Sequence, residues 1–387
     1  MEKKELALID VLREILCADY TAQFSLDGEE AETLYRLARH MDVAHILAFV
    51  SKKRGMLQRG TPIGDSLFRE QMLALFRYEG LAHEIARLRE LLETAGIAFV
   101  LLKGARIRAY YPEPFLRTSC DIDILVREEE LERASAIIAE NLGYHAKEKR
   151  DYHDISLYAP SGVHLELHFS ICENMPQQDQ LLSRVWEFTR PVREGSFERE
   201  MTAEYFLFHH LAHMAYHFLS GGCGVRPFMD YYLLARDMPY EREVFLSYCK
   251  ETGLLSFCNA VEETVACWFD GAPESEASLA LAAYIFRGGV YGHIENKVAV
   301  ERQKHKSKLS YLFHRIFMPL SLMRLRHPVL VRHAYLLPVF WIWRILQLPF
   351  GGSLRRTLGE ARISNELTDQ KSSETARLLS LVGLTSK

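Results

Sequence analysis

The sequence predicts an α+β fold in which a small sheet lies between two helical regions. Apolar residues recur at three- and four-residue steps over the first ninety or so residues and again from Ala203 onward, which is the period of amphipathic helices. Between these regions, short apolar runs alternate with turn signals such as Pro160-Ser-Gly162, a pattern typical of strands. We therefore expect an N-terminal helical region at 1–92, a core that contains the sheet at 93–195, and a C-terminal helical domain at 196–387.

The composition is that of a folded chain. Of the 387 residues, 48% are apolar and 25% are charged, and the formal net charge is −4. These values exclude a disordered chain, a collagen-like repeat and a disulfide-dense miniprotein. The seven cysteines are scattered without a CxxC pair, and no run reaches the ~18 uncharged apolar residues of a membrane-spanning helix. We expect a cytoplasmic protein with reduced cysteines and no transmembrane segment.

The N-terminal region is expected to be entirely helical. Apolar residues follow the helical period in Leu6–Leu16, Ala31–Leu47 and Leu67–Leu92, with charged residues on the opposite faces. The segment Gly55–Gly64 contains the turn signal Gly60-Thr-Pro62 and is predicted to separate the last two stretches.

The core is expected to begin with a buried strand. Ile97–Leu102 is a continuous apolar run that ends at Lys103-Gly104, which favours a strand that meets the start of a helix. The helix is short, from Ala105 to Tyr111, because the turn signal Pro112-Glu-Pro114 follows it.

Three further strands and one helix complete the expected core. Asp121–Val126 is the second strand, and Glu128–Asn141 is a strongly patterned helix that ends at Gly143. The runs Ile155–Tyr158 and Val163–Phe169 are predicted to form two strands joined by a hairpin turn.

Three carboxylates of this core are candidate metal ligands. Asp121 and Asp123 are two residues apart, so both side chains leave one face of the strand while Ile122 and Ile124 face the core. Glu166 lies on the polar face of the later strand, and the three carboxylates converge if the two strands are neighbours. Adjacent carboxylates need a counter-charge, which a divalent metal supplies. An acidic pair on a solvated strand end is the alternative interpretation.

Residues suited to anion binding stand at the end of the first strand. Lys103 and Gly104 lie at the expected strand-to-helix turn, where backbone N–H groups and the positive end of a helix can hold phosphate. Gly104 permits close approach of the backbone, and Lys103 adds a positive charge. Arg117 precedes Asp121 by four residues and is expected to contact the same phosphates or to hold the acidic pair in place.

These residues together resemble the uncharacterised nucleotidyltransferase family of the DNA polymerase β-like superfamily. The resemblance covers most of the chain, because further similar motifs occur after the core. At the turn where the superfamily usually has Gly-Ser, this chain has Lys-Gly, as is usual in the subfamily. The similar segments are Leu101-Leu-Lys-Gly-Ala105, Tyr111-Pro-Glu-Pro114, Arg117–Val126, His164-Leu-Glu-Leu-His168, Phe286–Gly292, Ser307–Phe313 and Tyr335–Pro338.

The resemblance implies a fold and a reaction. The fold is the polymerase β-like nucleotidyltransferase core, a small mixed sheet with helices, flanked by helical regions. The reaction is transfer of a nucleoside monophosphate from an NTP, with ATP the expected donor, to a hydroxyl group of a small acceptor, and pyrophosphate leaves. Asp121, Asp123 and Glu166 would hold two Mg²⁺ ions, while Lys103 and Gly104 would bind the nucleotide.

Two alternatives to this function stay open at the level of the sequence. One is a module that binds a nucleotide or a partner without catalysis, although the three carboxylates are present. The other is an enzyme directed at nucleic acid, in which a basic C-terminal segment follows the phosphate backbone. The second alternative is disfavoured because no aromatic-rich RNA-binding motif is visible.

A carboxylate after the core is the candidate general base. Similarity to antibiotic nucleotidyltransferases of the superfamily implies that a carboxylate of the helical domain activates the acceptor hydroxyl, and Asp230 is the residue we assign to that role. Arg226 lies four residues earlier and is expected to orient Asp230 or to bind phosphate. The alternative is a helix-surface ion pair worth only ~0.3–0.5 kcal/mol.

His209, His213 and His217 recur every four residues and therefore share one face of a helix. Histidines at this spacing can bind zinc, but the HExxH form is absent. Helix packing, or the wall of an active site, is the favoured interpretation.

The segment 302–359 is strongly basic. It contains eleven Lys or Arg and no Asp or Glu, so the remainder of the chain sums to −15 when the total is −4. We expect its aromatic residues to pack inward and part of its basic face to border the cleft, where it attracts the anionic nucleotide. An amphipathic membrane-surface helix is disfavoured because four prolines interrupt the segment.

Overall fold

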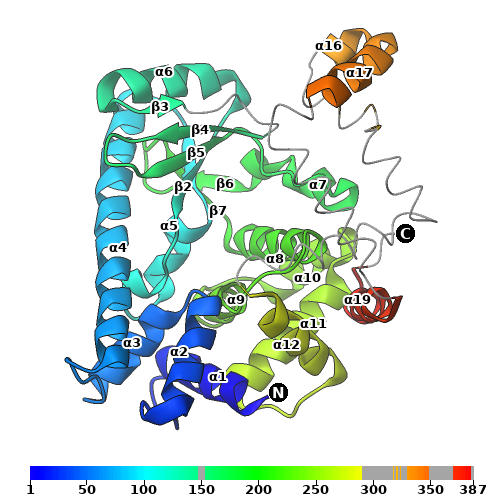
Figure 1. Cartoon of the computed structure of the whole chain (residues 1–387). Coiled ribbons are helices and arrows are strands. Elements are labelled where there is room, and N and C mark those ends of the chain that lie inside the picture. Colours follow the sequence, from blue (N-terminus) through cyan, green and yellow to red (C-terminus); the bar gives the residue numbers. More distant parts are fainter. Residues whose placement is uncertain are drawn as a thin grey trace.

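The chain forms a seven-stranded mixed sheet with helices on either side of it and a helical bundle below it (Figure 1). The computed structural model describes residues 1–146, 153–289, 317, 320, 323, 329–347 and 369–384. The expected α+β class is confirmed. Among the described residues, no helix is both long and apolar enough to cross a membrane.

The first four helices form the N-terminal region, as the apolar periodicity predicts. The expected helix at 31–47 is divided in two, because Asp42 adopts a left-handed backbone conformation with φ 52°. The fourth helix begins earlier than expected, at Pro62, where the Thr61 hydroxyl accepts a hydrogen bond from the N–H of Gly64 at 3.2 Å. These helices are α1 (Lys3–Leu16), α2 (Gly28–His40), α3 (Ala44–Lys53) and α4 (Pro62–Thr94).

The sheet has the strand order β3-β4-β5-β2-β1-β7-β6. The four expected strands are present, and β3, β6 and β7 are additional. Strand β7 pairs with β1 although it lies beyond residue 195, where we expected the core to end. The strands are β1 (Phe99–Leu101), β2 (Asp121–Val126), β3 (His145–Ala146), β4 (Asp154–Tyr158), β5 (His164–His168), β6 (Thr189–Pro191) and β7 (Glu198–Met201).

Short helical segments connect the strands. The helix expected at Ala105–Tyr111 is divided into α5 (Lys103–Ile107) and a 3₁₀ turn, Arg108–Tyr110. Helix α6 (Leu131–Leu142) ends as predicted at Gly143, whose φ of 71° is the left-handed conformation that suits glycine. A further helix, α7 (Pro176–Leu182), follows β5.

Helices that follow the sheet in the sequence form the bundle. The described part of the basic segment 302–359 contains two further helices, α16 and α17. Most of that segment lies outside the described residues, but Trp343, which we expected to pack inward, is 55% exposed. The helices are α8 (Ala203–Leu219), α9 (Arg226–Asp237), α10 (Arg242–Glu251), α11 (Leu255–Val265), α12 (Glu276–Gly288), α16 (Val329–Arg332), α17 (Leu337–Gln347) and α19 (Asp369–Leu381).

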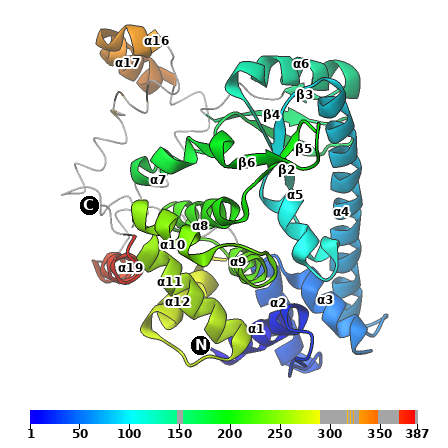
Figure 2. The ribbon, with the colours of Figure 1, turned by 180° about the vertical axis from the view of Figure 1, so that it is seen from behind.

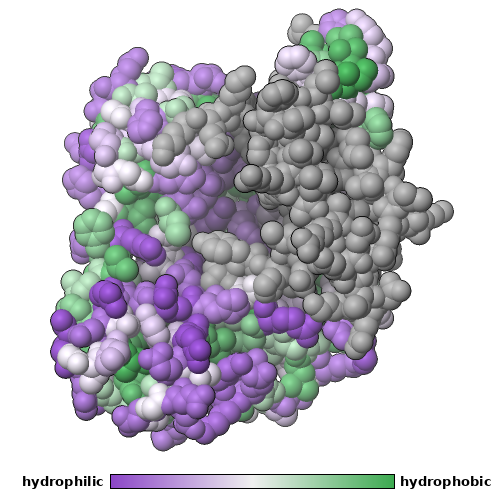
Figure 3. Space-filling view, viewed as in Figure 1, coloured by the Kyte–Doolittle hydropathy of each residue, from purple (hydrophilic) through white to green (hydrophobic). Residues whose placement is uncertain are grey.

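Two hydrophobic cores hold these parts together, and α4 belongs to both. Its first half contributes Leu67 and Ala74 to a large core shared by α1–α3 and α8–α12. Its second half contributes Leu88 and Leu92 to a core formed with the sheet and α6. Viewed from behind, α4 runs along the whole height of the molecule, from the N-terminal helices to α6 (Figure 2). The space-filling view shows a hollow between the part that contains the sheet and the helices below it, and the visible walls of this hollow are largely hydrophilic (Figure 3).

Candidate active site

The parallel pairing of β2 with β5 brings the three predicted carboxylates together. In the register of the two strands Asp121 lies opposite His164, and Asp123 lies opposite Glu166. Alternation along each strand places Ile122, Ile124, Leu165 and Leu167 in the core and turns the carboxylates to the other face. The three carboxylates were expected to converge if the two strands were neighbours, and β2 and β5 are paired.

The carboxylates form two overlapping groups of potential metal ligands. Asp121, His164 and Glu166 form one group, and Asp123, Glu166 and His168 form the other; within each group the ligand atoms lie within 4.8 Å of one another. Glu166 belongs to both. Such a shared carboxylate between two clusters can bridge two cations.

Two cationic side chains neutralise one side of this cluster. The Lys103 ammonium lies 3.1 Å from Asp123 Oδ1, and His168 Nε2 lies 3.0 Å from the same oxygen and 3.3 Å from Glu166 Oε2. Burial opposes the charged form of His168, yet its hydrogen bonds to Asp123 and Glu166 raise its pKa to about 9. Burial likewise opposes ionisation of Asp123, but Lys103 and His168 hold the pKa of that carboxyl well below its usual range.

Asp121 carries the unbalanced charge of the site. Burial, together with repulsion from Asp123 and Glu166, raises the pKa of Asp121 to about 6. Within the described part of the chain, Asp121 has no hydrogen-bond or ion-pair partner. A carboxylate in this position gains most from an added cation, so the arrangement fits a divalent metal with oxygen ligands.

The turn after β1 positions Lys103 and Gly104 against these carboxylates. Lys103 has a positive φ of 41°, an uncommon conformation for a residue with a side chain. A Cβ atom at Gly104 would lie 3.3 Å from the Ser119 Cβ and 3.5 Å from Arg117 Nη1, so the turn has little room for a larger residue. Because α5 has only five residues, its positive end contributes less to anion binding than we expected.

Arg108 is a buried cation that the sequence did not single out. Its Nε donates to the Gly104 carbonyl at 2.9 Å and its Nη2 to the Ser119 hydroxyl at 3.0 Å. Among the described residues no carboxylate pairs with it. Burial and the neighbouring Arg117 lower its pKa to about 10, so it stays charged at neutral pH. Arg108 therefore places a buried positive charge beside the Gly104 turn.

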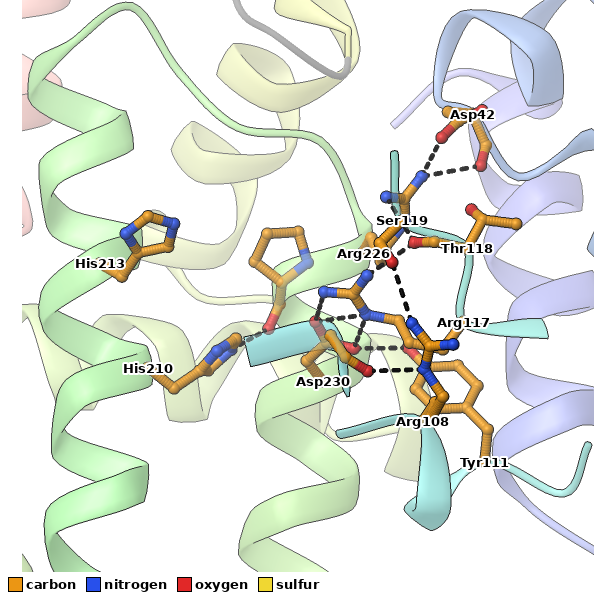
Figure 4. Close-up of polar contacts among 12 residues, drawn as sticks. Asp42, Arg108, Tyr111, Arg117, Thr118, Ser119, His210, His213, Arg226 and Asp230 are labelled. Carbon is orange, nitrogen blue, oxygen red and sulfur yellow. Dashed lines mark hydrogen bonds and ion pairs between the residues drawn. The ribbon is translucent and has the colours of Figure 1, made fainter. Parts of the chain in front are cut away.

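Arg117 and Asp230 form a buried pair, shown with their neighbours in Figure 4. Arg117 Nη2 lies 2.8 Å from Asp230 Oδ2, and Arg117 Nε lies 2.8 and 2.9 Å from the two oxygens. The Tyr111 hydroxyl donates to Asp230 Oδ1 at 2.8 Å. The Asp230 side chain is 1% exposed. Both of its oxygens are occupied, so the carboxylate has no open position for a substrate proton.

Arg226 contacts Asp42 rather than Asp230, the partner that we expected. It forms an ion pair with Asp42 and donates to the Thr118 carbonyl at 3.2 Å. Within the described residues it makes no contact with Asp230. The expected orientation of Asp230 by Arg226 is therefore wrong, because α9 directs Arg226 to the N-terminal region and to the segment that carries Arg117.

The α8 histidines His209, His213 and His217 are buried near enough to Lys103 to interact with it electrostatically. His213 Nδ1 lies 2.9 Å from Glu173 Oε1, and His217 Nε2 lies 2.9 Å from His213 Nε2. Burial and the positive charge of Lys103 lower the pKa of His209 to about 3 and that of His217 to about 4. None of the potential metal-ligand groups among the described residues includes these histidines. Helix packing, or a wall of the site, therefore stays the interpretation of these histidines.

The fold and the site define a class of protein: an α+β chain whose sheet carries a carboxylate cluster beside a cationic, glycine-containing turn. The sequence profile of a family described as "Uncharacterised nucleotidyltransferase" matches residues 27–270, which include every site residue named above. The chain belongs to this family, as its motifs predicted. No curated protein and no solved structure gives a significant match.

Proposed function

We propose that the protein transfers a nucleoside monophosphate from a Mg²⁺-bound NTP, with ATP the expected donor, to a hydroxyl group of a small molecule. Family membership supports nucleotidyl transfer in general. The observation that carries the metal dependence is the carboxylate cluster on β2 and β5, in which Asp121 is crowded by Asp123 and Glu166 and forms no ion pair with a described residue.

Asp121, Asp123 and Glu166 are the proposed ligands of two Mg²⁺ ions. Their oxygens fit Mg²⁺ by donor type, and Glu166 lies within reach of both aspartates. When bound, Mg²⁺ neutralises phosphate charge and makes the attacking hydroxyl more acidic. Lys103 and His168 hold Asp123 and Glu166 in place for this role.

The nucleotide phosphates are proposed to lie against the turn after β1. Lys103 and Gly104 were predicted for this role, and Arg108 joins them because its charge has no carboxylate partner in the described chain. Arg117 borders the same turn, since its Nη1 lies 3.5 Å from the position of a Cβ on Gly104. Cations grouped around a turn of this kind suit a triphosphate.

Asp230 and Arg226 are proposed to act on this region indirectly. Asp230 holds Arg117 in its orientation through a bidentate contact, which replaces the general-base role that we first expected. Arg226 fixes the Thr118 carbonyl, so it supports the segment that carries Arg117. Both are positioning residues in this proposal.

The direct test incubates the protein with α-labelled NTPs, Mg²⁺ and a cell extract. We expect Mg²⁺-dependent label on a small acceptor with the wild type and none with Asp121→Ala/Asp123→Ala. Glu187→Gln serves as a control that removes a carboxylate away from the site, because Glu187 is exposed and forms a surface ion pair with Arg184. Absence of both nucleotide binding and label transfer contradicts the proposal. Metal-dependent binding of ATP without transfer to any acceptor supports the non-catalytic module instead.

A further inference from the structure

Glu173, in the segment after β5, is a carboxylate that the sequence did not single out, and it interacts electrostatically with Lys103, His168 and Asp123 of the site. Asp179 fixes this segment: its Oδ1 accepts from the N–H of Glu173 and its Oδ2 from the N–H of Met175, both at 3.0 Å. The Glu173 side chain is thereby directed to α8, where its Oε1 lies 2.9 Å from His213 Nδ1. His213 Nε2 in turn lies 2.9 Å from His217 Nε2.

The direction of these hydrogen bonds follows from the protonation of the two histidines and of Glu173. Burial and the charge of Lys103 lower the pKa of His213 well below its ordinary value and that of His217 to about 4, so both are neutral at pH 7. A neutral imidazole has one N–H. An ionised Glu173 carboxylate can only accept, so in that state His213 Nδ1 donates to it, His213 Nε2 accepts, and His217 Nε2 donates to His213 Nε2. This chain holds Glu173 Oε1 and leaves Oε2 without a hydrogen-bond partner among the described residues.

Glu173 lies within electrostatic reach of the metal site. Burial raises its pKa to about 7, against the opposing effect of Lys103 and His168. A carboxyl that titrates near neutral pH is well suited to accept a proton at physiological pH. The charged and titratable groups that face it are Lys103 on α5, Asp123 on β2, His168 on β5, Asp179 on α7 and His213 on α8.

We propose that Glu173 is the general base that accepts the proton of the acceptor hydroxyl, and that His213 and His217 are its positioning residues. The proposal rests on the proposed nucleotidyl transfer. The acceptor oxygen forms a bond to the α-phosphorus, the bond from the α-phosphorus to the bridging oxygen breaks, and pyrophosphate leaves with that electron pair. The hydroxyl proton passes to Glu173 Oε2 and is released to solvent after the transfer. Asp230 cannot do this, because both of its oxygens are occupied.

The test measures pyrophosphate release from MgATP, with the low-molecular-weight fraction of a cell extract as the source of acceptor. Glu173→Gln is expected to lower the acceptor-dependent rate at least ~100-fold, while the Kd for MgATP changes less than about threefold. In the wild type the rate rises with pH through about 7, and this limb is lost in Glu173→Gln. Compared with Glu173→Gln, Glu173→Asp is expected to recover part of the rate and part of its rise with pH. Glu187→Gln is the control.

His217→Gln keeps the inference testable if Glu173→Gln fails to fold, because His217 is partly exposed and tolerates exchange more easily. It is expected to lower the rate and to shift the pH limb without changing the affinity for MgATP. A wild type that releases pyrophosphate, together with Glu173→Gln and His217→Gln variants of unchanged rate and pH profile, overturns the role of Glu173 alone. A wild type that neither binds MgATP nor releases pyrophosphate overturns the proposed function and this role with it.

Discussion

At the scale of single residues, the two aspartates of β2 differ in their surroundings. Asp123 is paired with Lys103 and His168, whereas Asp121 meets mainly other carboxylates. The folded state therefore favours the charge on Asp123 and disfavours the charge on Asp121. Identical residue types two positions apart thus make opposite contributions to stability when no metal is bound.

The two asparagine variants are expected to change stability in opposite directions. Asp121→Asn relieves repulsion and raises the free energy of unfolding in metal-free buffer by about 1–3 kcal/mol. Asp123→Asn removes the carboxylate that pairs with Lys103 and His168, and it lowers the free energy of unfolding by about 2–4 kcal/mol. Urea denaturation in the presence of EDTA measures both. Shifts of the same sign contradict the charge distribution described here, whereas both variants are expected to lose Mg²⁺-dependent activity.

Arg108 gives a second prediction at this scale. Arg108→Gln removes a buried positive charge that has no carboxylate partner within the described chain, so thermal stability is expected to stay equal or to rise. The Kd for MgATP is expected to increase at least ~10-fold, because the phosphates lose a desolvated cation. Calorimetric titration checks this against Arg190→Gln, a variant at a mostly exposed arginine. Equal affinity of both variants and the wild type excludes Arg108 from the phosphate site.

The predictability of the site differs from residue to residue. Asp121, Asp123 and Glu166 were predictable because strand alternation fixes which side chains share a face. Glu173 was not, because its place depends on contacts with Asp179 and α8 that no local pattern encodes. Arg226 and Asp230 lie four residues apart on one helix, which predicted a contact between them. Each instead forms an ion pair with a residue more than a hundred positions away in the sequence.

At the scale of elements, periodicity located the strands and helices that build the site, and tertiary pairing decided the rest. Strands β2 and β5 were expected from their alternating apolar residues, and the parallel register between them was not. Strand β7 lacks an apolar run and exists because it pairs with the edge of β1. Helix α2 ends early because the left-handed Asp42 breaks the helical path.

Helix α8 carries the pH prediction of this scale. Burial lowers the pKa of His209, His210, His213 and His217, so unfolding takes up protons between about pH 4 and 6.5. Stability contributed by these neutral histidines is complete above the pKa of the unfolded chain and is lost as the pH falls. Each contributes a slope of about 1.4 kcal/mol per pH unit.

Urea unfolding at several pH values measures this slope. His209→Gln is expected to reduce the slope by about 1.4 kcal/mol per pH unit, which corresponds to one proton fewer taken up on unfolding. His83→Gln, at an exposed histidine, is expected to leave the slope unchanged. Equal slopes for the wild type and His209→Gln show that His209 is not held neutral in the folded protein.

At the scale of the whole molecule, the N-terminal helices and the bundle share one hydrophobic core. Residues of α1 and α3 such as Leu8, Leu12 and Leu47 are fully buried within the core that α8–α12 build. The two helical regions that we expected at 1–92 and 196–387 are therefore packed together around one side of the sheet.

Deletion of residues 1–53 is expected to expose this core. Apolar burial is worth roughly 25 cal/mol per Å², and the large core would lose α1–α3 completely. We expect the truncated chain to lose its cooperative thermal transition and to become poorly soluble, as measured by calorimetry and size-exclusion chromatography. A truncated chain with an unchanged melting temperature shows that the N-terminal helices are an independent unit.

The central claim is that the carboxylates of β2 and β5 form a metal-dependent nucleotide site. Isothermal titration of the wild type with ATP, in the presence of Mg²⁺ and then of EDTA, tests it most directly. We expect binding with Mg²⁺, at least ~10-fold weaker binding in EDTA, and loss of the Mg²⁺ effect in Asp121→Ala/Asp123→Ala but not in Glu187→Gln. ATP affinity that is unaffected by Mg²⁺, or by removal of the two aspartates, contradicts the claim.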